Sequence, residues 1–317
     1  MTSTAMFTFH PLSESTRRRL IDGGVDPDAV AAVVRMAIAE DLAGGLDVTS
    51  AATVPAVQWS RATFGARRAG TLAGLPVAAA VIETVCGAHA SEFVYIASDG
   101  DRVEAGQDVA SVDAPTRLLL TAERSALNLL CHLSGVATLT RRWADALHGT
   151  KARVRDTRKT TPGLRFLEKY AVRCGGGLNH RMALSDAALV KDNHVLAAGG
   201  VAKAFAAVRS LADAIPVEIE VDSMDGLAEA MHAGADLVLL DNFAIATMRE
   251  AVDAMREYER GSGRRVLLEA SGGLSLEVAR AVAETGVDYI AVGELTHSAP
   301  VLDLGLDLQV TSTERGR

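Results

Sequence analysis

The sequence predicts an α/β protein whose larger part is a β/α barrel of somewhat fewer than eight strands. From about residue 150 onwards, short apolar stretches typical of strands alternate with amphipathic stretches typical of helices, an order that produces a parallel sheet. Six strands are clear, and a seventh is placed around 134–150 or 180–190. The six are ARVRDT, AALVKDN, VEIEVDS, LVLLDNF, VLLEASGG and YIAVGEL.

Nearly every one of these strands carries charged residues or glycines at its C-terminal end. In a β/α barrel these ends converge on one mouth, where such enzymes place their chemistry. A doubly wound open sheet would also line them up along one edge, so it remains an alternative. The number of strands favours the incomplete barrel.

Length and composition are those of a soluble α/β protein with one large domain or two. Hydrophobic residues make up 49% of the 317 positions and aromatic residues 4%, which allows a sizeable core. No stretch approaches the ~18 apolar residues of a membrane span, and the N-terminus lacks the features of a signal peptide. Three widely spaced cysteines predict neither disulfides nor a zinc site, and favour a reducing cytoplasm.

The N-terminal region is predicted to begin with a loose extension over residues 1–25, which are polar and show no periodicity. Asp26 and Pro27 have the residue types of an N-cap and a first helical position. The apolar rhythm after them predicts a helix that ends near Gly44-Gly45. The following LDVTSAATVP is expected to be a loop.

Residues 61–75 and 92–115 show the patterns and turn signals of strands. A helical region follows over residues 121–147, and Gly135 is expected to interrupt it. Arg124 lies near the start of this region; from the residues alone it is most simply a surface ion-pair partner.

A basic stretch between Lys151 and His194 is the strongest functional signal. It holds ten Lys and Arg residues against four acids, a local net charge of +6 in a chain of net charge -8. Such a field predicts an anionic ligand. The alternative is a solvated helix face, but the charges lie beside three glycines and where apolar strands end. The overall negative charge and the scarcity of aromatics argue against nucleic acid as that ligand.

Three further groups of residues suggest what the mouth binds. Glycine turns at 271–273 and at Gly293 follow late strands, where barrels commonly hold phosphate. Acids at strand ends have the hard oxygens that suit Mg²⁺, although each could instead be an ion-pair partner. The cations are too numerous for one phosphate group and indicate a polyanion or two anionic substrates. The acids are Glu220, Asp222 and Asp241, and the basic residues are Arg158, Lys159, His180, Arg181 and Lys191.

No nucleophile motif, Walker-type loop or GxGxxG loop is found in the sequence. Positioning and electrostatics would therefore have to provide the catalysis.

The ordered motifs together resemble those of the quinolinate phosphoribosyltransferases, over residues 26–308. The resemblance rests on EDLAGGLDVTS, AERSALNLLCHLSGVATLT, DTRKT, GGGLNHR, KDNH, VEIEVDS, LVLLDNF, LEASGGL and YIAVGELTHSAPVLDLGLDL. Ala183 stands where the family often has glycine, and residues 1–25 and 260–265 look longer than the family core. None of these departures affects a candidate site residue.

The resemblance implies an N-terminal α/β sandwich domain over 26–133 and a seven-stranded barrel over 134–295. A segment at 296–317 would return to the N-terminal domain. It further implies a cytoplasmic pentosyltransferase of NAD biosynthesis, a homodimer or higher oligomer that uses Mg²⁺. That enzyme joins quinolinate to phosphoribosyl pyrophosphate and releases nicotinate mononucleotide, pyrophosphate and carbon dioxide.

The resemblance also implies roles for individual residues. Lys159, Glu220 and Asp241 would be catalytic, and the two acids would hold the metal directly or through phosphoribosyl pyrophosphate and water. Arg124 would reach quinolinate from the neighbouring subunit. The other quinolinate-binding residues would be Thr157, Arg158, His180, Arg181 and Lys191. The phosphate-binding residues would be Lys159, Lys191, Ser271, Gly272, Gly273, Gly293, Glu294 and Leu295.

Two alternatives to this activity remain. A relative with an altered substrate is disfavoured because a monocarboxylate such as nicotinate would not need so many cations. A non-catalytic sensor of the same ligands is disfavoured because Glu220 and Asp241 are both present.

Overall fold

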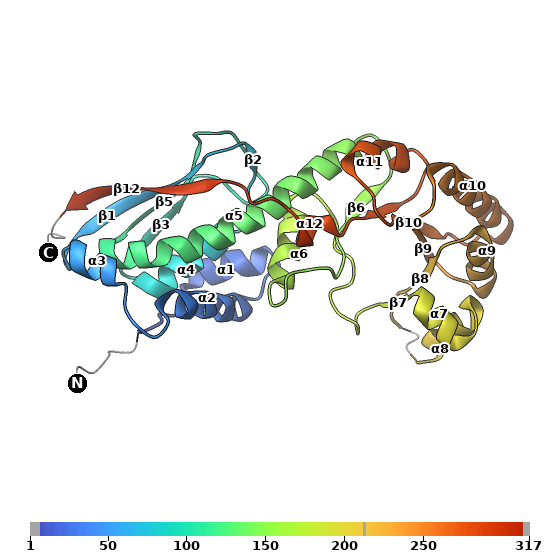
Figure 1. Cartoon of the computed structure of the whole chain (residues 1–317), viewed down its shortest axis with the longest axis horizontal. Helices are drawn as coiled ribbons and strands as arrows, with labels where there is room; N and C mark the ends of the chain where they lie inside the picture. The colour runs from blue at the N-terminus through green and yellow to red at the C-terminus, as the bar shows by residue number, and fades with distance from the viewer. Residues whose placement is uncertain (1–6, 212–213, 313–317) are drawn as a thin grey trace. The chain divides into compact units, whose positions relative to one another are not determined.

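The computed structural model describes residues 7–211 and 214–312, which form two compact units (Figure 1). The first unit takes in the chain up to Leu139, then Thr161–Gly175, and the chain from Ala299 onwards. The second comprises Thr140–Thr160 and Gly176–Ser298. Neither unit is contiguous in sequence, whereas the limits expected from the sequence are single cuts at 133/134 and 295/296. Those domain limits remain a prediction.

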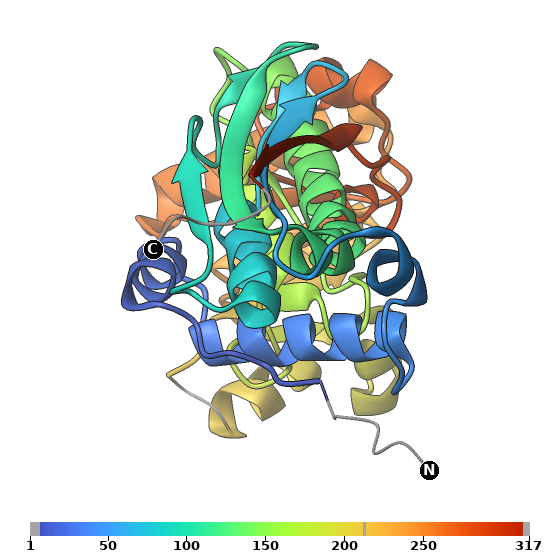
Figure 2. The same ribbon diagram turned by 90° about the vertical axis from the view of Figure 1, so that its left-hand side faces the viewer.

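The first unit is an α/β sandwich, as predicted. Its main sheet is antiparallel with the strand order β12-β1-β5-β3, and β2 pairs with β4 in a second, two-stranded sheet. Helix α4 is buried along its whole length. It contacts β5 on one side and α1 and α2 on the other, so the helices form a layer under the sheet (Figure 2). The strands are β1 (Trp59–Ala66), β2 (Gly70–Thr71), β3 (Glu92–Tyr95), β4 (Arg102–Val103), β5 (Asp108–Pro115) and β12 (Leu304–Ser312).

The helices of this unit begin and end at definite sequence signals. Asp26 caps α2 and Pro27 occupies its first turn, as predicted, and α2 ends at Leu42. The helices are α1 (Glu14–Asp22), α2 (Pro27–Leu42), α3 (Val48–Thr53), α4 (Leu75–Cys86), the first part of α5 (Thr116–Ala146) and α6 (Arg165–Cys174).

Two expectations for the N-terminal region are wrong. Residues 14–22 of the supposed loose extension form α1, because Ser13 caps the helix and Leu20 is buried. The buried Glu83 accepts hydrogen bonds from the Ser13 and Thr16 hydroxyls and so ties α1 to α4. Part of the supposed loop after Gly45 is helix α3, whose cap is Asp47.

Gly135 does not interrupt a helix, because α5 runs unbroken through it. A Cβ at this position would lie 2.9 Å from the Cα of Val301. Glycine at this position therefore allows the segment at Val301 to pack closely against α5. This packing outweighs the cost of about 1 kcal/mol that glycine adds to a helix. The alternative placement of a strand at 134–150 is wrong for the same reason: α5 occupies that stretch up to Ala146.

The second unit is an incomplete β/α barrel built on a parallel sheet of six strands in the order β6-β11-β10-β9-β8-β7. From β7 to β11 consecutive strands are neighbours, and the first strand of the unit, β6, pairs with the last, β11, as in a barrel. Among the described residues no ladder joins β6 to β7, so the barrel is open there. The strands are β6 (Arg153–Arg155), β7 (Ala188–Val190), β8 (Val217–Val221), β9 (Leu237–Asp241), β10 (Leu267–Ser271) and β11 (Tyr289–Ala291).

All six clear strands of the sequence are present, and no seventh strand joins the sheet within residues 7–211 and 214–312. Its place is marked by a single parallel bridge between Leu178 and Arg155, just before the stretch where it was expected. Helices follow the strands around the sheet (Figure 1). They are α7 (Asp192–Ala198), α8 (Val201–Leu211), α9 (Met224–Ala233), α10 (Ile245–Ser262), α11 (Leu276–Ala283) and α12 (Glu294–His297). No helix in the described part of the chain combines the length and apolar character needed to cross a membrane.

Candidate active site

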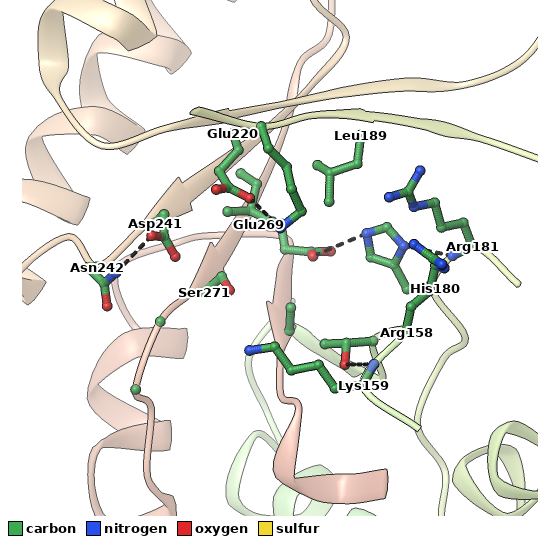
Figure 3. Close-up of a pocket in the computed structure, with 16 residues that line it drawn as sticks. Arg158, Lys159, His180, Arg181, Leu189, Glu220, Asp241, Asn242, Glu269 and Ser271 are labelled. Carbon is green, nitrogen blue, oxygen red and sulfur yellow. Dashed lines mark hydrogen bonds and ion pairs between the residues drawn. The ribbon is translucent and has the colours of Figure 1, made fainter. Parts of the chain in front are cut away.

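A cavity of about 620 Å³ lies within the second unit, at the C-terminal ends of its strands (Figure 3). This is where parallel strands direct the groups that follow them. Eleven of the residues singled out in the sequence line it: Thr157, Arg158, Lys159, His180, Arg181, Lys191, Glu220, Asp241, Ser271, Gly272 and Gly273.

The cationic side of the cavity is only partly neutralised by the protein. The Nε of Arg158 is buried without a hydrogen-bond partner among the described residues. Burial and the nearby charge of Arg158 lower the pKa of the Arg181 guanidinium. Lys159 extends across the cavity towards the side on which Ser271 lies (Figure 3). Uncompensated positive charge of this kind attracts a ligand with more than one anionic group.

The acidic side of the cavity is formed by Glu220 and Asp241, at the ends of neighbouring strands β8 and β9. Glu220 is paired with Lys191, whose Nζ lies 3.2 Å from its Oε2. The Nδ2 of Asn242 donates to Oδ2 of Asp241 over 2.7 Å. Each carboxylate therefore keeps oxygens available to a ligand while its direction is fixed.

A buried polar cluster lies at the base of the cavity. The Nε2 of His180 is 2.7 Å from Oε2 of Glu218 and 3.7 Å from Oε1 of Glu269. Arg155 donates to the other oxygen of Glu269 over 2.6 Å. The His180, Glu218 and Glu269 ligand atoms lie within 4.8 Å of one another. A nitrogen ligand is a poor match for Mg²⁺, so this cluster does not fit the metal expected from the sequence.

Burial raises the pKa of Glu269 from 4.5 to about 7, and the neighbouring charge of Glu218 adds to the shift. The folded chain therefore holds a proton that the unfolded chain loses between these two pH values. Folded-state stability should fall as the pH rises through this window. We expect Glu269→Gln to remove a pH-dependent contribution on the order of 3 kcal/mol.

The measurement is urea unfolding of the wild type and the variant at several pH values between about 4.5 and about 8. Glu250→Gln, which changes an exposed carboxylate, should keep the wild-type dependence. Equal slopes for wild type and Glu269→Gln would show that the buried carboxyl does not titrate in this range.

Two glycine turns lie close to the catalytic candidates. Gly272 has φ +97°, and a Cβ there would lie 2.8 Å from the backbone N of Asn242. Gly293 precedes α12, and a Cβ there would lie 3.0 Å from Cδ of Lys159. The Thr296 hydroxyl donates to the Lys159 carbonyl over 2.8 Å and ties α12 to this loop. Gly272 thus needs to be glycine for close packing against Asn242, whereas at Gly293 a Cβ would be tight only against side chains.

Some of the predicted site residues do not line the cavity. Asp222 is exposed, and Gly293 and Leu295 lie at the start of α12, where Leu295 is buried. The Glu294 carboxylate is held by the indole N–H of Trp143, 3.1 Å away. Arg124 is exposed on α5 of the first unit.

Three functional candidates were not identified from the sequence: Arg155, Glu218 and Glu269. Each is a charged residue that belongs to a strand of the parallel sheet. That signal was available, because a strand residue with its side chain in a barrel interior needs a partner there. Which partner each would find could not be deduced without the order of the strands.

The chain matches the N-terminal domain of quinolinate phosphoribosyl transferase over residues 47–134 and its C-terminal domain over residues 136–307. It belongs to the quinolinate phosphoribosyltransferase family. A similar curated relative is the nicotinate-nucleotide pyrophosphorylase [carboxylating] of Mycobacterium leprae, 51% identical over 281 residues, which cover 89% of this chain and 98% of that protein.

Other members of the quinolinate phosphoribosyltransferase family agree with this assignment. Quinolinate phosphoribosyltransferase [decarboxylating] 1 of Nicotiana glauca is 36% identical, with 87% of this chain and 81% of the relative covered. The structure of the nicotinate-nucleotide pyrophosphorylase from Francisella tularensis superimposes with a TM-score of 0.83 at 38% identity. That match covers 89% of this chain and 96% of the other.

Proposed function

We propose that this protein transfers the phosphoribosyl group of phosphoribosyl pyrophosphate to quinolinate, with loss of carbon dioxide, in NAD biosynthesis. The products are nicotinate mononucleotide, pyrophosphate and carbon dioxide. The proposal rests on the cavity of this chain, in which several cations face the carboxylates of Glu220 and Asp241. Two anionic substrates that react through a positively charged sugar carbon need that arrangement.

Quinolinate has two carboxylates, and Arg158, Arg181 and Lys191 supply cations on one side of the cavity. Arginine can bind a carboxylate through two parallel hydrogen bonds, whereas lysine acts as a point charge. Thr157 and His180 complete this wall, and Lys159 lies where it can contact both substrates. The pyridine nitrogen is thereby held ready to attack the sugar.

The phosphoribosyl substrate occupies the other side. Backbone N–H groups of Ser271–Gly273 bind its 5′-phosphate, and the turn at Gly293–Leu295 supports them. As the bond to pyrophosphate breaks, positive charge develops on the ribose carbon. The carboxylates of Glu220 and Asp241 stabilise that charge, and the nearby cations stabilise the leaving pyrophosphate.

Decarboxylation follows ribosylation in this scheme. Once the ring nitrogen carries the sugar it is positively charged. The bond between C2 and its carboxylate then breaks, carbon dioxide leaves, and the electron pair remains on C2 beside that nitrogen. A proton taken up at C2 completes the product. The ring itself accepts the charge, so no organic cofactor is required.

Magnesium fits the acidic side of the cavity. Glu220 and Asp241 both line it and offer carboxylate oxygens, which Mg²⁺ prefers, together with the oxygens of the pyrophosphate. When bound, the ion would neutralise the leaving pyrophosphate. We place it there, directly or through the substrate and water.

A cytoplasmic homodimer is part of the same proposal. Arg124 is an exposed cation on α5, and in the proposed dimer it reaches the quinolinate of the partner. The negative net charge makes nucleic acid an unsuitable ligand.

The deciding experiment measures labelled carbon dioxide released from carboxyl-labelled quinolinate, with phosphoribosyl pyrophosphate and Mg²⁺ each supplied or withheld. Release that requires both is the expected result. Turnover of nicotinate in place of quinolinate would assign a neighbouring activity, and tight binding without turnover would identify a sensor.

A further inference from the structure

We infer that His180 acts as a positioning residue: anchored by Glu218, its ring holds the backbone of Arg181 and offers no ring nitrogen to the substrate. The inference rests on the proposed function and assigns Glu218 a part in selecting the dicarboxylate. The sequence alone predicts that His180 is one more residue that contacts the ligand.

Both nitrogens of the His180 ring are already engaged. The backbone N–H of Arg181 donates to Nδ1 over 2.7 Å. A nitrogen that accepts a hydrogen bond carries no proton, so the proton of the neutral ring lies on Nε2. The Nε2 lies 2.7 Å from Oε2 of Glu218 and therefore donates to it. His180 thus faces the cavity with its ring carbons.

Glu218 is a rigid anchor for this ring. It lies within β8 and is 3% exposed. Its neighbour Glu269 is fully buried and is itself held by Arg155. The anchor is thus part of the barrel interior, where side-chain movement is small.

The backbone on either side of the ring is held independently. The buried Asp156 accepts from the His180 N–H over 2.8 Å and from the Asn179 side chain over 2.6 Å. The His180 ring is consequently fixed at its backbone and at its far end. Its Nδ1 becomes a stationary acceptor for the next residue.

Arg181 needs this restraint because of its surroundings. Arg158 lines the same cavity, and two like charges in one partly buried site repel each other. The backbone N–H of Arg181 is held by His180, and one guanidinium nitrogen donates to the Ala187 carbonyl over 3.1 Å. The rest of the guanidinium is thereby directed at the ligand before the ligand arrives, which reduces the entropy lost on binding.

The two ring nitrogens can be tested separately. The side-chain oxygen of asparagine can occupy the position of Nδ1, whereas the longer glutamine reaches only the position of Nε2. We expect His180→Gln to raise KM for quinolinate by about tenfold or more, the effect of one lost anchoring interaction. His180→Asn should raise it markedly less. KM for phosphoribosyl pyrophosphate should change little in either variant.

Glu218 provides the second arm of the test. Glu218→Gln keeps an oxygen that can accept from Nε2 and should retain a KM for quinolinate close to that of the wild type. Glu218→Leu removes the acceptor, leaves the His180 ring without its anchor and should raise this KM clearly above that of Glu218→Gln. Calorimetric titration with quinolinate alone gives the same comparison without turnover.

The inference is overturned if His180→Gln has a lower KM for quinolinate than His180→Asn, because His180 would then act through a direct contact of Nε2 with the substrate. Equal KM values for Glu218→Leu and Glu218→Gln would overturn it as well. A general loss of folding would lower the apparent kcat and Tm without raising KM for quinolinate, and so differs from the selective effect. Failure of the proposed function would instead leave the wild type itself inactive.

Discussion

Lys159→Ala and Arg124→Ala are each expected to be almost inactive, yet mixing the two proteins should restore activity. Lys159 extends into the cavity between the acidic and cationic sides. Removing one such preorganised charge from a transition state costs about 10²–10³-fold in rate. Arg124 is not among the residues that line the cavity, and in the proposed dimer its loss removes a cation from the site of the partner subunit.

The extent of recovery follows from the symmetry of a dimer. When the two variants exchange subunits at equal concentration, about half of the dimers are mixed, and each of these has one site with neither lesion. About a quarter of the wild-type activity should return. The measurement is the rate of carbon dioxide release before and after subunit exchange.

The controls separate shared sites from other effects. Arg142→Ala changes another exposed arginine of α5 and should be fully active. Exchange is demonstrated with two differently tagged proteins that co-purify after mixing. No recovery despite proven exchange would mean that each site is built from one chain.

Some of the acidic and cationic candidates could be predicted because they lie at the C-terminal ends of apolar strands. Asp241 comes at the end of LVLLD and Lys191 comes after ALV, and in a parallel sheet such positions meet at one edge. The prediction required only strand patterns and one topological rule. It needed no knowledge of the order of the strands.

The buried cluster beneath them could not be predicted in the same way. Glu218 and Glu269 lie on β8 and β10, with β9 between them, and their proximity to His180 depends on the curvature of the barrel. Similarly, α1 is held by Glu83 on α4, a contact far away in sequence. Gly135 fits into α5 because of packing against Val301. In each case a tertiary contact overrides the local pattern.

Alanine at Gly272 should damage the phosphate side of the cavity far more than alanine at Gly273. Both glycines have positive φ, +97° and +57°. The second value lies in the left-handed region, where alanine costs roughly 1–2 kcal/mol. The φ of Gly272 lies outside that region, where alanine is still less favourable. A Cβ at Gly272 would also collide with Asn242, whose own φ is +56° and whose side chain donates to Asp241.

A collision at this point must displace Asn242, because backbone and side chain are both close to the new atom. Asp241 then loses its hydrogen bond as well, so one substitution disturbs the proposed phosphate-binding turn and the proposed catalytic carboxylate together. We expect Gly272→Ala to lower kcat/KM for phosphoribosyl pyrophosphate by about 10²-fold or more, equivalent to about 3 kcal/mol.

Gly273→Ala is the matched control, since a Cβ there meets nothing within 4 Å. It should lower Tm slightly and keep kcat/KM within about tenfold of the wild type, because strain of this size can be absorbed by the loop. Steady-state kinetics with each substrate varied, together with thermal unfolding, distinguishes the two variants. If both lose the same amount of activity, backbone conformation alone limits the turn. In that case the contact between Gly272 and Asn242 does not connect the phosphate site to Asp241.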